Sequence, residues 1–425
     1  FQEGDNRFAP GDRFLAIDGK PLRSRTELAD ELGKLAAGKS ITVQVLRSGE
    51  KQSVTWTPFP AGRTAKPGEL LPQVAAELKP GRLLNIHHQL GFTFSGSPLS
   101  PGPDNLLGMT PIEKGGSIKL PRGSYLAVLQ LEGRPPVKIP IVVPGSEAEM
   151  TVRIPEKLPA GFVYIAAGTF FAGGDDQSQA RQNLEPFWYS LPGFFISRLE
   201  VSFGDYLQFL NDAEVLARTD AKGTIEPLAD RSELTTQGLT SNRSRVLLIP
   251  HYNGQALFGR TANGNWGRRS VVPVSGPLCG ISMLAALEYA HWYTGSQSDG
   301  FTYRLPTDLE WEKAARGVDG RTHVWGEQPV GSFCRSESSR LRDFLFPESR
   351  GVFPNDESVY GVRDLAGSVL EPTTSRTIGG YVSLRGGWYG TADDYLFHAS
   401  TRFGRPASRA QHDAGIRLVG VRGKK

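Results

Sequence analysis

Residues 303–317 read YRLPTDLEWEKAARG, an extended segment that runs into a short helix with clear boundary signals. Pro306 excludes a helix before it, and Thr307 with Glu310 three residues later forms the pattern of a capping box. Gly317 stands where helices commonly end in a left-handed residue. We therefore predict a helix that begins after Thr307 and ends at Gly317.

Four further motifs follow this helix in a fixed order. They are VWG at 324–326, YGVRDLAGSVLE at 360–371, LRGGW at 384–388 and GIRLV at 415–419. Together with the helix, the series resembles the formylglycine-generating enzyme (sulfatase-modifying factor) family, whose fold is a variant of the C-type lectin fold. The resemblance extends from Gly161 to Val421. It implies an α+β domain of this lectin-like type.

The region upstream of the helix resembles the start of the same family. Residues 161–174 alternate as two strands, and Ser202 with Asp205 predicts another capped helix. Residues 281–292 resemble a later family helix. Between these segments, residues 212–275 match the family poorly, so we predict a long insertion. Its expected strands are 245–249, 256–260 and a segment around Trp266.

The first part of the chain has the pattern of a PDZ-like segment over residues 1–59. An Asp18-Gly19 turn joins two strands, a capping box at Ser24 and Glu27 predicts a helix, and residues 41–47 alternate as a half-buried strand. The segment resembles the second half of a PDZ domain. The peptide-pairing half would precede Phe1, so we expect a packing or spacer role and a chain cut from a longer protein.

Two segments separate this part from the lectin-like domain, which we place at 158–425. Residues 60–80 are rich in Pro, Gly, Ala and Lys and predict a linker with a short helical pattern at 73–78. Residues 81–157 alternate with period two between Pro/Gly turns, which predicts a small β-sandwich. This sandwich resembles the carboxypeptidase-regulatory-like spacer modules. Several domains suit a chain of 425 residues.

Composition excludes several classes of function. The net charge is only +4 and no dense Lys/Arg stripe occurs, which argues against a nucleic-acid partner. No apolar run is long enough for a membrane helix, and we find no signal peptide. Two cysteines, Cys279 and Cys334, are too few for a disulfide framework or a thiolate cluster. The sequence does not indicate a compartment.

The resemblance also implies what an active member would contain. Active relatives are copper-dependent oxidases that bind Cu(I) through two cysteines shortly after the RGG motif. Here Thr391 and Leu396 occupy those positions, while Cys279 and Cys334 lie in other motifs. Hydroxyl and hydrocarbon groups cannot replace soft thiolate ligands. We therefore expect no copper and no oxidase activity, and we find no catalytic triad, phosphate loop or three-histidine iron site.

A calcium site is the one metal site that the resemblance carries over. The family holds calcium with main-chain carbonyls and one glutamate of the segment that corresponds to YGVRDLAGSVLE at 360–371. The corresponding positions are the carbonyls of Asp364, Gly367 and Val369 and the carboxylate of Glu371. Oxygen-only ligands suit a hard cation. The alternative is a Glu371 that simply caps a turn.

Residues 388–413 mix aromatic and polar side chains, a composition typical of recognition surfaces. In the lectin-type fold this stretch lies where enzymes place the active site and hypervariable relatives place ligand contacts. The predicted ligand-binding residues are Trp388, Tyr389, Thr391, Asp393, Asp394, Tyr395, His398, Arg405, Gln411 and His412. The alternative is that part of the stretch, with Tyr395 and Phe397 first, belongs to the core.

The overall pattern is most similar to cysteine-free members appended to the C-terminus of bacterial serine/threonine kinases. It predicts a non-catalytic sensor or regulatory module with a kinase domain upstream. The module would bind a protein or small-molecule ligand through residues 388–413, and the 212–275 insertion is a second candidate surface. One alternative is an oxidoreductase of the formylglycine-generating type acting on a peptide cysteine. Another is a structural or assembly domain.

Overall fold

The computed structural model describes residues 13–22, 31, 40–47 and 50–56, the strands named below between 73 and 153, residue 155, and 157–422 with gaps. The gaps are 175–183, 185, 237, 239, 241–243, 270, 328, 341–345 and 378. The chain forms two compact units. One comprises Phe1–Ala75, Ser117–Gly123 and Val143–Thr151, and the other Ala76–Gly116, Ser124–Val142 and Val152–Lys425.

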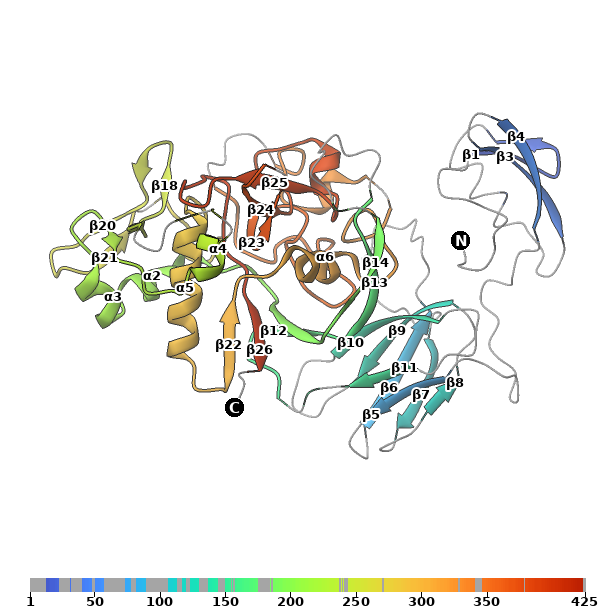
Figure 1. The fold of residues 1–425 in the computed structure, drawn as a ribbon, viewed down its shortest axis with the longest axis horizontal. Coiled ribbons are helices and arrows are strands. Elements are labelled where there is room, and N and C mark those ends of the chain that lie inside the picture. Colours follow the sequence, from blue (N-terminus) through green and yellow to red (C-terminus); the bar gives the residue numbers. More distant parts are fainter. Residues whose placement is uncertain are drawn as a thin grey trace. The chain divides into compact units, whose positions relative to one another are not determined.

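The first unit contains a four-stranded antiparallel sheet in the order β2-β1-β3-β4 (Figure 1). The strands are β1 (Arg13–Ile17), β2 (Lys20–Pro21), β3 (Ile41–Arg47) and β4 (Glu50–Trp56). Asp18 and Gly19 both have positive φ, which confirms the predicted turn. The small core comprises Ile17, Ile41, Val43, Val45 and Val54. The helix predicted after Ser24 lies outside the described residues.

Seven strands between 73 and 153 form two further sheets, β10-β9-β6-β7 and β11-β5-β8. They are β5 (Gln73–Glu77), β6 (Arg82–His88), β7 (Leu106–Ile112), β8 (Ser117–Lys119), β9 (Gly123–Leu129), β10 (Val137–Val143) and β11 (Met150–Arg153). The helical pattern predicted at 73–78 is wrong, because Gln73–Ala75 pairs with β8. A helix signal of so few residues is weak, and strand pairing overrides it.

The domain that we predicted to be lectin-like is built on an antiparallel sheet in the order β12-β15-β26-β22. Its strands are β12 (Phe162–Ile165), β15 (Phe194–Ser197), β22 (Phe301–Arg304) and β26 (Val419–Arg422). β26 lies between β15 and β22 and pairs with both, so that Gly420 faces Phe195 on one side and Tyr303 on the other (Figure 1). The C-terminal strand therefore joins segments more than 100 residues apart.

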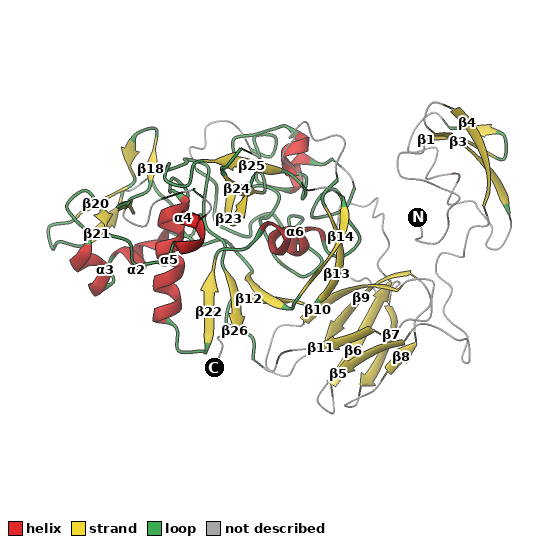
Figure 2. Cartoon of the chain, in the orientation of Figure 1, coloured by secondary structure: helices red, strands yellow, loops and turns green. Residues whose placement is uncertain are grey.

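Three helices, drawn in red in Figure 2, lie in this domain as predicted: α2 (Phe203–Leu210), α5 (Met283–Ser296) and α6 (Asp308–Arg316). Both capping boxes are present, and α6 ends at Gly317, whose φ is 77°. Trp311 of α6 is fully buried in the main core with Val362, Leu365 and Phe397. The core therefore joins α6 to the motifs that follow it.

A second sheet, β23-β24-β25, carries the predicted ligand-binding stretch. Its strands are β23 (Glu371–Arg376), β24 (Val382–Arg385) and β25 (Arg402–Arg405), and the short helix η3 (Asp394–Phe397) lies in the connection from β24 to β25. Near α6, β13 (Gly168–Ala172) pairs with β14 (Phe187–Leu191). Among the described residues, no helix is both long and apolar enough to cross a membrane.

The region predicted as an insertion contains three short strand pairs. These are β16 (Thr224–Ile225) with β17 (Val246–Leu247), β18 (His251–Tyr252) with β19 (Gln255–Ala256), and β20 (Phe258–Arg260) with β21 (Trp266–Arg268). β17, β20 and β21 lie in the three expected segments, whereas β16 and β18 were not predicted. Two short helices, α3 (Ala213–Arg218) and α4 (Ser232–Thr236), were not predicted. A buried ion pair of 2.6 Å between Arg231 and Glu288 attaches this region to α5.

Candidate functional site

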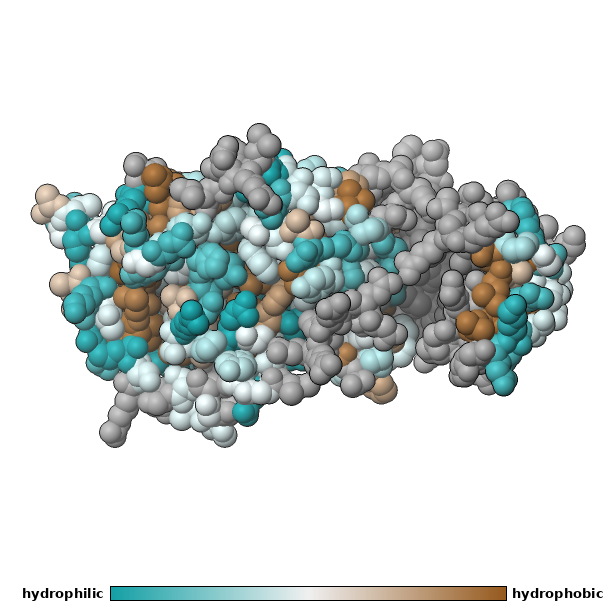
Figure 3. Space-filling model, turned by 90° about the horizontal axis from the view of Figure 1, so that it is seen from above, coloured by the Kyte–Doolittle hydropathy of each residue, from teal (hydrophilic) through white to brown (hydrophobic). Residues whose placement is uncertain are grey.

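The predicted ligand-binding residues differ in how far they are exposed to solvent. Tyr389, Thr391 and His398 are buried, while Asp393 and His412 are exposed. The half-buried members are Trp388, Asp394, Tyr395, Arg405 and Gln411. The domain face that carries β25 is mainly hydrophilic, with its apolar residues in small separate patches (Figure 3). Binding by the stretch as a whole stays a prediction, and two smaller arrangements within it have defined geometry.

The first arrangement brings two histidines onto one carboxylate. Nε2 of His323 lies 3.0 Å from Oδ1 of Asp394, and Nε2 of His398 lies 3.2 Å from Oδ2 of the same residue. The two histidine side chains are buried, 1% and 4% exposed, whereas the side chain of Asp394 is 43% exposed. Partial burial raises the pKa of Asp394, but the hydrogen bonds and charges of the two histidines outweigh this and hold it below its usual value.

Local structure fixes both histidines. Asp394 begins η3 and His398 directly follows it, so one short turn sets their spacing. The N–H of Ala399 donates to the carbonyl of Thr322 (2.8 Å), which brings His323 beside His398. The His323 ring also stacks on Trp325, with centroids 5.1 Å apart and planes inclined by 14°. The buried Phe397 anchors the turn in the main core.

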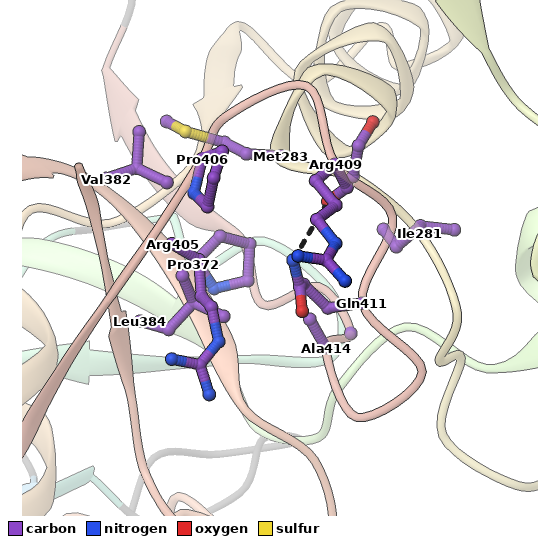
Figure 4. A pocket seen from close by; sticks show the side chains of 12 residues that line it. Ile281, Met283, Pro372, Val382, Leu384, Arg405, Pro406, Arg409, Gln411 and Ala414 are labelled. Atoms are coloured by element: carbon purple, nitrogen blue, oxygen red, sulfur yellow. Dashed lines mark hydrogen bonds between the residues drawn. The ribbon is translucent and has the colours of Figure 1, made fainter. Parts of the chain in front are cut away.

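The second arrangement is a pocket of about 240 Å³, a volume that includes space open to solvent. Its apolar lining comes from α5, β23, β24 and the segment before α5, and includes Ile281, Met283, Pro372, Val382 and Leu384 (Figure 4). Its polar lining comprises Ser282 at the start of α5, Arg405 at the end of β25, and Arg409 and Gln411 from the loop that follows. The amide of Gln411 donates to the carbonyl of Arg409 (3.4 Å; Figure 4).

Neither guanidinium group of this pocket is neutralised. Among the described residues, no carboxylate pairs with Arg405 or Arg409, and the guanidinium of Arg405 donates to the carbonyl of Gly404 (3.3 Å). Arg405 is half-buried and Arg409 is exposed. The pocket therefore combines an apolar floor with two positive charges that are available to a ligand.

Neither cysteine occupies a position that holds copper in active relatives. Cys279 and Cys334 are both free and buried, and burial raises the pKa of each thiol. The Cys334 thiol contacts the Gly331 carbonyl at 3.7 Å and belongs to the main core. Thr391 and Leu396 are both about 5% exposed and offer no thiolate. The residues at these positions do not fit a Cu(I) site.

The side chain proposed for calcium binding has other partners. Both carboxylate oxygens of Glu371 accept from Nε of Arg417 (2.8 and 2.9 Å), and Oε2 also accepts from the Trp311 indole (2.6 Å). Nη2 of Arg417 lies 2.7 Å from Oε1. A buried guanidinium thus takes the place that a cation would need, and Glu371 does not fit a calcium ligand. The carbonyls of Asp364, Gly367 and Val369 stay an untested prediction.

Sequence reasoning missed His323, Met283 and Arg409 as site residues. His323 directly precedes the VWG motif at 324–326, so the motif indicated that His323 lies in the family domain. Its partners lie 71 and 75 positions further along the chain, and no local spacing reveals that contact. Met283 was assigned to its helix alone.

Comparison with known proteins was made at three levels. The family described as "sulfatase-modifying factor enzyme 1-like domain" matches residues 148–421, and the PDZ domain family matches residues 3–57. Among solved structures, PvdO from Pseudomonas aeruginosa aligns with a TM-score of 0.43 and 18% identity over 61% of this chain and 93% of its own.

The curated relatives are named for different activities. Inactive C-alpha-formylglycine-generating enzyme 2 of Bos taurus is 30% identical over 277 residues, 60% of this chain and 87% of the relative. Hercynine oxygenase of Mycobacterium tuberculosis is 27% identical over 44% of this chain, which spans only 38% of that relative. Serine/threonine-protein kinase Pkn1 of Chlamydia trachomatis is 24% identical over 55% of this chain and 30% of the kinase.

The family match covers more than half of the chain and contains every motif from the helix at 308–316 to the final strand. The structure has the elements that these motifs predicted, with α6 packed in the same core as the later motifs. The chain belongs to the sulfatase-modifying factor enzyme 1-like family.

Proposed function

We propose that the chain is a non-catalytic recognition module that binds a carboxylate-bearing peptide segment in the pocket beside Arg405 and Arg409. The observation that carries the proposal is the pair of guanidinium groups without carboxylate partners among the described residues, above an apolar floor. Guanidinium groups bind carboxylates strongly and with defined geometry. Ile281, Met283 and Leu384 would contact the apolar part of the same segment.

The size of the pocket favours part of a peptide over a whole small molecule. Its enclosed space is only about 10 Å³, room for about one water molecule, so a ligand would lie across the open mouth of the pocket. The mouth would take one acidic side chain or a terminal carboxylate, with a neighbouring apolar side chain against the apolar lining. The surrounding hydrophilic face suits a polar, hydrated interface (Figure 3).

Absence of oxidase chemistry is the second part of the proposal. Thr391 and Leu396 supply no thiolate, and the thiols of Cys279 and Cys334 are buried with raised pKa values. One relative is named as inactive and another as a serine/threonine kinase, which supports a regulatory module of a signalling protein. The PDZ-like part at 1–59, the linker from 60 and the β-rich part up to 157 would then act as spacers before the 158–425 domain.

A peptide array tests the recognition. Acidic hexapeptides are compared with versions in which Asp and Glu are replaced by Asn and Gln and the C-terminus is amidated. We expect the full chain to retain acidic peptides selectively, and an Arg405→Gln/Arg409→Gln variant to lose that selectivity. Arg376→Gln, an exposed change at the end of β23, is the matched control. Equal retention of both peptide sets by the wild type would overturn the proposal.

A second assay tests the lack of oxidase activity. The chain is incubated with Cu(I), oxygen and a cysteine-containing sulfatase peptide, and mass spectrometry is used to detect the aldehyde product. We expect the peptide to remain unchanged while a known formylglycine-generating enzyme converts it. Turnover by this chain would instead support the oxidoreductase alternative.

A further inference from the structure

We propose that His323, Asp394 and His398 form a binding site for a divalent transition-metal ion of the Zn²⁺ or Fe²⁺ class. Their ligand atoms, one from each residue, all lie within 4.8 Å of one another. The site is independent of the copper and calcium sites of the family, since it shares no residue with Thr391, Leu396 or Glu371.

The distances support a common ion. Bonds of about 2.0–2.2 Å to nitrogen and oxygen place neighbouring ligand atoms of one metal about 3.0–3.5 Å apart. Each histidine Nε2 is already 3.0 or 3.2 Å from an oxygen of Asp394. The three ligand atoms are up to 4.8 Å apart, so the partly exposed side chain of Asp394 would have to rotate to bring all three donors onto one ion.

The site is rigid on its inner side and open on its outer side. His323 is held by stacking on Trp325 and His398 by the turn that Phe397 anchors, so both imidazoles are positioned before a metal arrives. The Asp394 side chain is 43% exposed, so solvent reaches the cluster there. A water molecule or a ligand atom can complete the coordination from that side, as in sites with three protein ligands.

The donor set selects the class of metal. Two imidazoles with one carboxylate are borderline ligands that suit Zn²⁺ and Fe²⁺, whereas Mg²⁺ and Ca²⁺ prefer oxygen ligands throughout. Nδ1 of His323 is buried and has no hydrogen-bond partner among the described residues. Metal-bound histidines usually have such a partner, and its loss typically costs about 10–100-fold in affinity. We therefore expect binding on the order of micromolar rather than nanomolar.

The competing arrangement is a purely hydrogen-bonded triad, in which the carboxylate of Asp394 orients two imidazoles without a metal. Calorimetric titration of the untagged, chelator-treated full chain with Zn²⁺ distinguishes the two. Asp394→Asn keeps the size of the side chain and, at a partly exposed position, is not expected to disturb folding. Asp393→Asn serves as the control, because it removes the same charge from the neighbouring position, where the side chain is exposed.

We expect saturable Zn²⁺ binding by the wild type and by Asp393→Asn, and binding weakened by more than about 100-fold in Asp394→Asn, since loss of an outer partner alone costs about 10–100-fold. Co²⁺ bound in place of Zn²⁺ should give a visible absorption band that Asp394→Asn abolishes. No saturable binding by the wild type, equal binding by Asp394→Asn, or equal loss in both variants would overturn the proposal.

Competition identifies the class of ion. Millimolar Mg²⁺ or Ca²⁺ should leave Zn²⁺ binding unchanged, whereas Fe²⁺ under anaerobic conditions should compete with it. Displacement by Mg²⁺ or Ca²⁺ would overturn the assignment to a borderline metal. His398→Asn, checked for folding by circular dichroism, should lose Zn²⁺ binding as Asp394→Asn does, and retention of binding would count against the site.

Discussion

Two fully buried arginines, Arg385 and Arg417, neutralise the buried carboxylates of Glu312 and Glu371. Nη2 of Arg385 donates to Oε2 of Glu312 (2.6 Å) and to the carbonyl of Ala399 (2.8 Å). Burying such charges is costly, and the cost is offset only while the partners remain in place. These arginines of the LRGGW and GIRLV motifs therefore have structural roles.

At Arg385 we predict a large loss of stability from a single change. Arg385→Leu would leave Glu312 without one of its cations in a dry environment, which typically costs about 3–5 kcal/mol. Arg376→Leu, at an exposed position of the neighbouring strand β23, should change the free energy of unfolding by less than about 0.5 kcal/mol. Urea unfolding followed by tryptophan fluorescence measures both. Similar losses in the two variants would contradict the role given to Arg385.

Glu200 gives a prediction about pH. Burial, with the nearby carboxylate of Asp364, raises the pKa of Glu200 well above its usual value despite the Arg417 guanidinium. The native state therefore holds a proton that the unfolded state releases at about pH 4.3. The stability from this proton is complete below that pH and is lost as pH rises through the native pKa. Glu200→Gln cannot ionise, so its stability should increasingly exceed that of the wild type as pH rises.

Thermal unfolding of Glu200→Gln and wild type from pH 5 to pH 8 measures this difference. The midpoints should be similar at the acidic end and separate in favour of the variant at the alkaline end. Glu214→Gln, in α3 with a side chain 73% exposed, should show no such separation. A difference between Glu200→Gln and wild type that stays constant with pH would show that Glu200 does not titrate in this way.

Among the elements, α6 shows which local signals suffice for prediction. Thr307 accepts from the Glu310 N–H at 3.2 Å, and Glu310 accepts in return from the Thr307 N–H at 2.8 Å. These contacts are set within four residues, so sequence alone predicted the start of the helix. β5 shows the opposite case, because Gln73–Ala75 becomes a strand through pairing with Ser117–Lys119, a partner that no local pattern reveals.

The cap of α6 can be tested by one substitution. Thr307→Ala removes the acceptor for the first-turn N–H and should lower the free energy of unfolding by about 1 kcal/mol. Thr302→Ala, at an exposed position of β22, controls for the loss of a threonine. Chemical unfolding monitored by circular dichroism compares the two. An effect no larger than that of the control would show that the Glu310–Arg304 pair holds the turn without the threonine.

The difference between local signals and tertiary contacts also explains how much of the candidate site could be predicted. The LRGGW motif at 384–388 fixes the place of the following stretch in the fold. That stretch contains Asp394, His398, Arg405 and Gln411, which were therefore predicted. His323 lies beside Asp394 and His398 through tertiary contacts, namely the backbone bond between Ala399 and Thr322 and its own contact with Asp394. The role of Glu371 was hidden for the same reason, since Arg417 reaches it from 46 positions away.

The whole molecule has separate apolar cores. The core around Val43 belongs to the β1–β4 sheet, and the core around Trp311 belongs to the lectin-like domain. Their members do not overlap. A chain with distinct cores is expected to unfold in more than one cooperative step.

Calorimetry of paired core variants tests this independence. Val43→Ala and Val362→Ala each remove buried methyl groups from a fully buried position, one in each core. Each should lower the transition of its own core by roughly 1–3 kcal/mol and leave the other in place. A common shift of all transitions in either variant would indicate a single cooperative unit.

The position of β26 has a consequence for biosynthesis. The ribosome makes β12, β15 and β22 long before residues 419–422, yet β26 is the strand that joins β15 to β22. Until it emerges, each of the two older strands presents an unsatisfied edge, which is a hazard for aggregation. Nascent chains that stop short of residue 419 should therefore depend on chaperones, and release of the final strand should be the step that closes the domain.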